Sequence, residues 1–466
     1  MKMNKIIKIG IFSLAMAVTA TSCSDSFVER EFYQEVEQAP LTTLNEMQAF
    51  IKGGYVSLRA NTYYGADFLA YGEVRSDEMI SNLAGGYYQN VMNYTMLSND
   101  AYATNTYTQI YALIAKANIV INTDISTIKG TDLDRKNAAY AQGQAYAMRA
   151  IGFFDLQRLY GQKYTGGTLG IVLPLKYDPK ALIPRSTIAE TEAQIDADFT
   201  KALALMTANG AVTNTTKTEL TINSVKGMAS RFYLYKGDYA KVRTFTNDLF
   251  GKYSVPAASL LQETFRFSLN GAAPNSIFEL AVGINASLST NSYRQRLNPN
   301  GYGNIVVNAS TLAAYAANDV RKSFITTSGG QNFLSFSSNN NGIGKYTQGV
   351  GADNIKMLRY EEILLNGVEA ELNGGDPVKA LNYYNLVVTN RGLPAATSID
   401  MPTLKKERMK ELLGEGIRQW DLRRWGDVVP RPAGAKTDVN LNAFPIPRSE
   451  TDLANSPVVS NPGYDN

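Results

Sequence analysis

Apolar residues recur at helical spacing along most of the chain. The clearest run is Met357, Tyr360, Leu364, Val368 and Leu372, whose spacing of three or four residues places the side chains on one face of a helix. We therefore predict a mainly α-helical fold. The same periodicity predicts helices at about 44–60, 105–122, 136–160, 188–207, 219–236, 238–250, 356–373, 377–391 and 403–426.

Two turns between predicted helices share the frame L-x-x-G-D-x-x-K, at Leu234–Lys241 and Leu372–Lys379. In each frame a glycine can close one helix in the left-handed conformation, and the following aspartate can cap the next helix. Thr43 and Glu46 form a capping box at the start of the first helix. These turns are typical of tetratricopeptide-type helix pairs. The two frames lie far apart, so we predict that the array of helix pairs is interrupted.

The interruption lies at about 251–355, where the composition shifts to Gly, Asn and Ser. Short strands are predicted inside it at Ser276–Val282 and Asn304–Val307. Loop-rich segments of this length usually carry a function. We expect a helical scaffold at about 40–250 and 356–466, with the insertion contributing a binding surface.

Tyrosine is the residue type that best indicates a binding site, with 28 copies against two Trp. Its flat apolar face and polar rim suit ligands such as sugars and peptides. Several tyrosines fall in predicted loops, beside Asn and Arg side chains that can orient hydroxyls or amides. Half-buried packing is the alternative role for each of them. The candidates are Tyr63, Tyr64, Tyr87, Tyr88, Tyr94, Tyr293 and Tyr302, with Asn90, Asn93, Arg294, Arg296 and Asn304 as polar partners.

The absence of histidine and the single cysteine exclude much of common enzyme chemistry. No Ser-His-Asp or Cys-His triad, His-ligated metal site, thiolate cluster or internal disulfide can form. A glycosidase using two carboxylates is still open, and Asp77 with Glu78 is its least implausible pair. The Gly-rich segment Gly161–Gly170 lacks the lysine of a phosphate-binding loop. We therefore expect a binding protein without catalytic residues, cofactor or metal.

Residues 1–22 have the features of a secretory signal. Three lysines precede the apolar run Ile9–Val18, and small residues lead to Cys23, the only cysteine. This order resembles a bacterial lipoprotein signal, which predicts acylation of Cys23 and a polar tether over 23–39; ordinary cleavage near Ala20 is the alternative. The chain has 45 basic and 42 acidic side chains, and removing the three leader lysines leaves a neutral protein. Neutrality gives no reason to expect nucleic acid as a partner.

Near the C-terminus, Glu415, Arg418, Asp421 and Arg424 are spaced by threes in a predicted helix. Neighbours at this spacing can form a ladder of opposite charges. We interpret the set as a structural ion-pair network that clamps the last helices together, in preference to an anion-binding or acid–base site.

The same C-terminal segment, Glu411–Trp425, resembles the signature of the SusD/RagB family, the surface nutrient-binding lipoproteins of Bacteroidetes. Further matching motifs follow the family's order along nearly the whole chain. They are Gln144–Gly161, Pro184–Thr187, Asp319–Lys322, Leu358–Leu365, Asn390–Leu393, Phe444–Pro447 and Asn461–Tyr464.

The resemblance implies one domain over 40–466, built on about four tetratricopeptide-like helix pairs. It also implies an outer-membrane lipoprotein that faces the cell exterior and pairs with a SusC-like TonB-dependent transporter. The ligand would be an oligosaccharide, or a peptide in some members, captured and handed inward without being cut. A surface-anchored carboxylate glycosidase and a purely structural adaptor are the alternatives.

Overall fold

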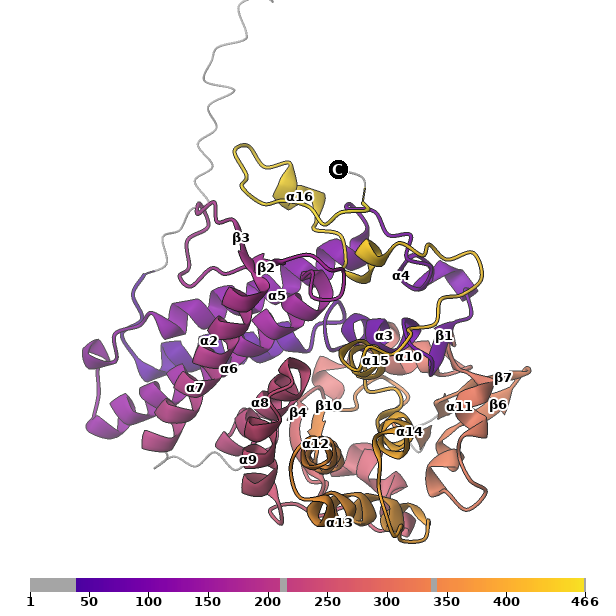
Figure 1. Ribbon diagram of the computed structural model, residues 1–466. Helices are drawn as coiled ribbons and strands as arrows, with labels where there is room; N and C mark the ends of the chain where they lie inside the picture. Colours follow the sequence, from indigo (N-terminus) through magenta and orange to yellow (C-terminus); the bar gives the residue numbers. More distant parts are fainter. Residues whose placement is uncertain (1–38, 210–215, 337–341, 465–466) are drawn as a thin grey trace, which may run out of the picture. The chain divides into compact units, whose positions relative to one another are not determined.

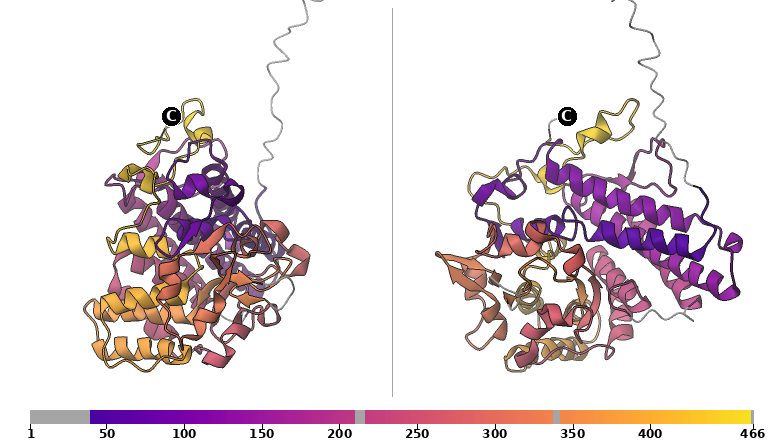
Figure 2. Two further views of the ribbon diagram at one scale, coloured as in Figure 1. Left: turned by 90° about the vertical axis from the view of Figure 1, so that its right-hand side faces the viewer. Right: turned by 180° about the vertical axis from the view of Figure 1, so that it is seen from behind.

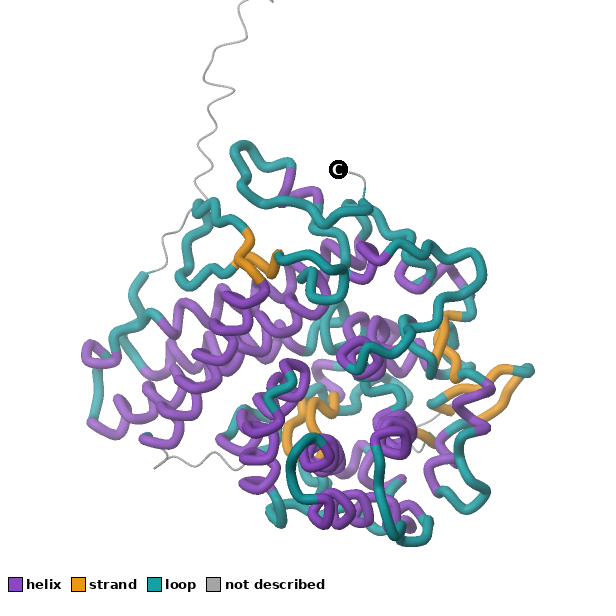
Figure 3. The backbone as a smooth tube through the Cα atoms, in the orientation of Figure 1, coloured by secondary structure: helices purple, strands orange, loops and turns teal. Residues whose placement is uncertain are grey.

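Long helices that follow one another in sequence pack side by side in the computed structural model (Figures 1 and 3). The structure describes residues 39–209, 216–336 and 342–464, so the predicted signal over 1–22, Cys23 and most of the tether lie outside it. The described residues from Leu41 onward form one unit, and their eight scaffold helices make four pairs, which confirms the predicted fold class. These helices are α2 (Leu44–Leu58), α5 (Ala101–Ile121), α6 (Asp132–Tyr160), α7 (Ile188–Ala208), α8 (Ile222–Lys236), α9 (Tyr239–Leu249), α12 (Tyr360–Leu372) and α13 (Pro377–Val388).

Shorter helices and strands complete this unit, and Figure 2 shows the arrangement from two further sides. The shorter helices are α3 (Asp67–Val74), α4 (Gln89–Met92), α10 (Tyr293–Leu297), α11 (Ala309–Ala313), α14 (Met401–Leu412), α15 (Arg418–Arg424) and α16 (Arg448–Thr451). The strands are β1 (Met79–Ser81), β2 (Leu169–Val172), β3 (Arg185–Thr187), β4 (Ser276–Leu280), β5 (Ile305–Val307), β6 (Thr326–Ser328), β7 (Gln331–Phe333), β8 (Ser335–Phe336), β9 (Ile343–Gly344) and β10 (Ile355–Arg359).

The local signals at the helix ends act as predicted, except that in the second shared turn the left-handed glycine is Gly374 and not the predicted Gly375. Thr43 and Glu46 form the capping box of α2, because each side chain accepts a hydrogen bond from the other's backbone N–H. Gly237 is left-handed at the end of α8, and Asp238 caps α9. Asp376 caps α13 at the second turn.

Two predicted helices are corrected by the structure. The segment 356–373 begins as strand β10, because its first residues pair with β4, with Ile355 opposite Leu280. The segment 403–426 is two helices, α14 and α15, separated by a turn with left-handed Gly414 and Gly416. A Cβ on Gly416 would lie 2.8 Å from Cα of Leu69 in α3, so this turn exists to let α3 approach closely.

The insertion is joined to the scaffold by two antiparallel strand pairs. Strand β4 pairs with β10, directly before α12. Strand β5 pairs with β1, with Val306 opposite Ile80, in a sheet of order β1-β5-β7-β6. The second pairing brings the loop after β1 beside the loop before β5, where Asn82 N–H donates to the carbonyl of Asn304 over 3.0 Å. Two polar, aromatic stretches that are far apart in sequence therefore meet.

A buried ion-pair network centred on Glu411 of α14 lies under these connections. Glu411 accepts hydrogen bonds from Arg321 of the insertion (2.9 Å), Arg359 of β10 (3.0 Å) and Arg391 after α13 (2.9 Å). All four side chains are at most 2% exposed. Burial alone would raise the pKa of Glu411, but the three guanidiniums hold it well below the ordinary value. The carboxylate is therefore charged and fully paired.

The structure confirms an ion-pair network among the last helices but not the predicted ladder along one helix. Glu415 lies in the turn before α15 and pairs with Arg359 over 2.7 Å. Arg418 pairs with Asp77 over 2.7 Å. Only Asp421 and Arg424 form one of the expected pairs within the helix, at 2.9 Å. Glu415 joins a different segment because the turn at Gly414 and Gly416 leaves it outside α15, whereas Arg418 lies in α15 and takes its partner from another segment.

The close approach of α3 to the turn before α15 gives the first prediction. A Cβ on Gly72 would lie 2.2 Å from the carbonyl oxygen of Gly416. This oxygen belongs to the backbone, so relieving the overlap requires a costly backbone shift. We expect Gly72→Ala to lower the free energy of unfolding by about 2 kcal/mol, measured by urea denaturation. Gly53→Ala is the matched control, since its Cβ meets only the flexible Lys116 side chain at 3.3 Å. Equal stability of both variants would contradict this account of the α3 contact.

Candidate ligand-binding site

Most of the tyrosines predicted to form platforms are packed in the interior. A platform needs a ring face that is open to solvent, and these rings have none in this structure. The packing role left open by the sequence describes them. The buried candidates are Tyr63, Tyr64, Tyr88, Tyr94 and Tyr293, each at most 3% exposed, together with Arg294 and Asn304.

Specific contacts explain why these rings are inside. The Tyr63 hydroxyl donates to buried Asp155. The Tyr88 hydroxyl donates to Asp67 over 2.8 Å, and burial raises the pKa of Asp67 to about 6. Tyr293 packs its edge against Tyr346, with ring centroids 5.1 Å apart.

Tyr87, Tyr302, Asn90 and Asn93 are the predicted candidates that reach the surface, Asn93 only in part. Tyr302 is 43% exposed, Tyr87 is partly exposed, and Asn90 is exposed and donates to Asp100 over 3.0 Å. The rings of Tyr87 and Tyr302 lie 5.2 Å apart with an angle of 44° between their planes. They come from the two stretches that the β1–β5 pairing brings together. We call this pair of rings, together with the Arg296 guanidinium that packs against both of them, the Tyr87–Tyr302 site.

Arg296 of α10 supports both exposed rings. Its guanidinium carbon lies 4.1 Å from the centroid of Tyr87 and 4.8 Å from that of Tyr302. The side chain is 6% exposed, and its Nε and Nη1 atoms have no hydrogen-bond partner among the described residues. A cation held against two tilted rings fixes the orientation of their faces, and its two unused donors are themselves buried.

The loop that carries Tyr87 is held in an unusual backbone conformation. Leu83 and Tyr88 have left-handed φ angles of 66° and 57°, although neither is glycine. The hydroxyl of Ser81 fixes the loop by donating to the carbonyl of Tyr87 over 2.7 Å. Non-glycine residues in this region cost energy and concentrate at functional sites. Together with the exposed ring pair, the strain favours this loop as part of a binding site.

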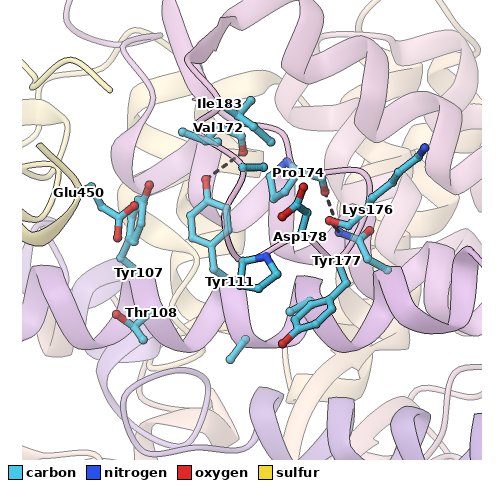
Figure 4. Close-up of a pocket in the computed structure, with 15 residues that line it drawn as sticks. Tyr107, Thr108, Tyr111, Val172, Pro174, Lys176, Tyr177, Asp178, Ile183 and Glu450 are labelled. Atoms are coloured by element: carbon cyan, nitrogen blue, oxygen red, sulfur yellow. Dashed lines mark hydrogen bonds between the residues drawn. The ribbon is translucent and has the colours of Figure 1, made fainter. Parts of the chain in front are cut away.

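A second candidate site is a hollow along α5, under the segment that follows β2 (Figure 4). It has a volume of about 440 Å³ and is lined by Tyr111, Asn118 and Tyr177, among others. Tyr111 donates to the carbonyl of Val172 over 2.9 Å, and Asn118 donates to that of Pro174 over 2.8 Å. These polar groups hold the overlying segment in place, so fewer of them are left to bind a ligand. No feature of the sequence indicated this hollow.

The acid pair considered for glycosidase chemistry is divided between two structural roles. Asp77 holds Arg418 of α15 in a bidentate ion pair at 2.7 and 2.8 Å. Glu78 is 1% exposed and interacts with Glu73, which is also fully buried. Burial, and then the nearby Glu73, raise the pKa of Glu78 well above its ordinary value. Burial raises the pKa of Glu73 to about 7. Neither Glu73 nor Glu78 opens onto the Tyr87–Tyr302 site.

Comparison with known protein families identifies the fold that carries this site. Residues 30–234 match a family model described as "Starch-binding associating with outer membrane", and residues 326–457 match the model of the SusD family. The chain belongs to the SusD/RagB family. This confirms the resemblance carried by its sequence motifs.

Relatives of this SusD/RagB-family chain align over nearly its whole length. SusD-like protein P2 of Formosa agariphila is 23% identical over 98% of this chain and 100% of its own. Among solved structures, a SusD superfamily protein from Bacteroides thetaiotaomicron has a TM-score of 0.79 at 23% identity, covering 90% of this chain and 100% of its own. Surface glycan-binding protein A from the same organism, in complex with laminarihexaose, has a TM-score of 0.71 at 17% identity, covering 90% of this chain and 100% of its own. These structures share the fold.

The described part of this family member contains no helix that is both long and apolar enough to span a membrane.

The buried acids of this SusD/RagB-family chain give a prediction for pH. The pKa values of Glu73 and Glu78 are both raised in the folded chain, so it retains protons that the unfolded chain releases. The stability of the fold therefore falls as the pH rises from about 4.5 through the folded pKa values. Glu78→Gln cannot ionise. We expect it to remove up to about 1.4 kcal/mol of this loss per pH unit, so that its melting temperature declines less steeply than wild type between pH 5 and 9.

The control for this experiment is Asp132→Asn, whose side chain is 90% exposed and whose decline should match wild type. Parallel melting curves for wild type and Glu78→Gln across this pH range would show that the buried acid does not titrate as described.

Proposed function

We propose that the chain captures glycans at the cell surface through the Tyr87–Tyr302 site. The observation that carries the proposal is an exposed aromatic pair, supported by a buried arginine and built from two stretches far apart in sequence. Tyrosine faces match the C–H surfaces of sugar rings, and buried Arg296 holds the two rings in place. The glycan complex of the similar surface glycan-binding protein A supports a carbohydrate over a peptide as the ligand class.

We further propose that the ligand is passed on uncut. The two acids considered as a glycosidase pair have other roles: Asp77 is bound to Arg418, and Glu78 is buried beside Glu73. A retaining or inverting glycosidase needs two carboxyl groups facing each other across the sugar. The Tyr87–Tyr302 site presents rings and a guanidinium instead. Binding without bond cleavage is therefore the function that its chemistry supports.

Delivery and location complete the proposal. Capture of this kind serves import when the binding protein sits on a SusC-like TonB-dependent transporter. We propose that acylated Cys23 anchors the chain to the outer membrane, facing outward, with residues 24–39 as the tether. The family description of association with the outer membrane supports this location. Several buried acyl chains would supply the membrane affinity, since no helix among the described residues is long and apolar enough to span a membrane.

The site is tested by substitution of its more exposed ring. We expect Tyr302→Ala to weaken binding of laminarihexaose, or of the best ligand in a glycan panel, by about tenfold, because one stacking face is lost. Isothermal titration calorimetry measures the change. Tyr177→Ala is the matched control, since Tyr177 is 44% exposed but lies in the hollow along α5.

The two variants also discriminate between the candidate sites. If Tyr177→Ala weakens binding and Tyr302→Ala does not, the ligand lies in the hollow along α5 and the Tyr87–Tyr302 site is wrong. If the chain binds peptides but no glycan in the panel, the ligand class is peptide and the glycan proposal is wrong.

The anchor and the transporter are tested together in the native organism. We expect the tagged wild-type chain to fractionate with the outer membrane and to co-purify with a large TonB-dependent barrel after detergent extraction. Cys23→Ser should leave the outer-membrane fraction, because the acyl chains supply the membrane affinity. Retention of Cys23→Ser in that fraction would contradict lipid anchoring, and a wild-type preparation without a barrel would contradict delivery.

A further inference from the structure

Three arginines converge on Tyr94, away from the exposed rings of the Tyr87–Tyr302 site. Arg75 follows α3, Arg423 lies in α15, and Arg431 lies in the loop after α15. The guanidinium carbons of Arg75 and Arg431 each lie 3.9 Å from the centroid of the Tyr94 ring. Helices α3 and α15 pack against each other (Figure 1), and this packing brings Arg75, at the end of α3, close to Arg423 of α15. We call Arg75, Arg423 and Arg431 the arginine cluster.

The cluster lacks the acid that several other buried arginines have. Arg149, for example, meets Asp198 at 2.7 Å, and Arg391 meets Glu361 at 2.7 Å. Among the residues that the structure describes, no carboxylate forms an ion pair with any member of the cluster. Three positive charges are therefore gathered without a carboxylate partner among the described residues.

Several donors of the cluster are buried and unused. Arg75 is 1% exposed and Arg423 is 7% exposed. Nη2 of Arg75, and Nε and Nη2 of Arg423, have no hydrogen-bond partner among the described residues. A buried donor without a partner destabilises the fold, and a buried charge without a counter-charge does so more strongly. Burial, and repulsion between neighbouring guanidiniums, lower the pKa of Arg75 and of Arg423.

The chain's own acceptors satisfy only the other side of the cluster. Arg75 donates through Nε to the carbonyl of Val91 over 2.7 Å and through Nη1 to that of Leu441 over 3.1 Å. Arg431 donates to the carbonyl of Asp438 and, over 3.0 Å, to the side chain of Asn442. These bonds fix the guanidiniums in place. The remaining donors of Arg75 and Arg423 are then positioned for an acceptor that comes from outside the chain.

We propose that the arginine cluster is a binding site for an oxyanion, a carboxylate, sulfate or phosphate group. Planar guanidiniums bind such groups through paired N–H···O bonds. Arg75 and Arg423 would contact the anion, and half-buried Arg431 lies at its entrance. The anion is either a free ion or an acidic substituent of a sugar, and both have the same chemistry at this site. Along the chain, the segment from Tyr87 to Tyr94 connects the cluster to the Tyr87–Tyr302 site.

Titration of the full chain with sodium sulfate at constant ionic strength tests the site. We expect saturable stabilisation of the melting temperature relative to sodium chloride. Arg423→Gln should weaken the apparent affinity about tenfold, because charge-assisted hydrogen bonds are lost. Arg448→Gln is the control, since Arg448 is 43% exposed and makes only a long ion pair with Asp452 at 3.7 Å. Its affinity should equal that of wild type.

A crystal soaked in sodium selenate locates the anion directly, and this arm holds even if Arg423→Gln fails to fold. Anomalous density within hydrogen-bond reach of Arg75 and Arg423 supports the site. Ordered water alone at that place, or an adventitious ion elsewhere without saturable binding, overturns it. Binding of glucose 6-sulfate, with glucose as the uncharged control, then separates a free anion from an acidic substituent of a sugar. Tighter binding of glucose 6-sulfate than of inorganic sulfate assigns the site to an acidic glycan. Equal binding of the two assigns it to free anions.

Discussion

The structure depends on one buried carboxylate that is shared by three arginines. Glu411 of α14 binds Arg321 of the insertion, Arg359 of β10 and Arg391 after α13. Removing one partner from such a network leaves an uncompensated charge in the interior, which costs several kcal/mol, about 3–5 for a single broken pair. The network therefore requires that the insertion, the strand before α12 and the last helices assume their places together.

This constraint determines where the candidate site lies. The insertion is held at Arg321 by the network and at β5 by its pairing with β1. Tyr302 lies on the loop just before β5, and Tyr87 lies on the loop after β1. Both loops reach the surface beside the β1–β5 pairing. A rigid interior and two exposed ring faces are thus consequences of the same set of attachments.

The helical scaffold could be predicted from the sequence because its signals are local. Apolar periodicity, the Thr43 capping box and the turn at Gly237 each act over a few residues. The strand β10 was not predicted, because its partner β4 is distant and its apolar residues also fit a helix. The break between α14 and α15 was missed for a similar reason, since Gly416 is required by the approach of Leu69 in α3.

The candidate site was predictable only in its residue type. Tyr87 and Tyr302 were named together with Tyr63 and Tyr94, and nothing local separates an exposed tyrosine from a buried one. The pairing of Tyr87 with Tyr302 depends on the register of β1 and β5. Arg75 and Arg423 were not among the candidates, because the absence of a neighbouring carboxylate is a property of the folded chain. A helix start can be recognised from a capping motif, but no sequence motif marks an arginine that lacks a neighbouring carboxylate in the folded chain.

The strand pairing of β1 with β5 has a consequence for how members of such a fold diverge. The two tyrosines lie just beyond the paired residues, so a substitution or a change in loop length there alters the outer face without disturbing the ladder. The internal charge network, in contrast, tolerates little variation, because each of its members satisfies several others. Preference for a cargo can then drift during evolution while the architecture stays constant, and one ancestral frame can give rise to a repertoire of receptors.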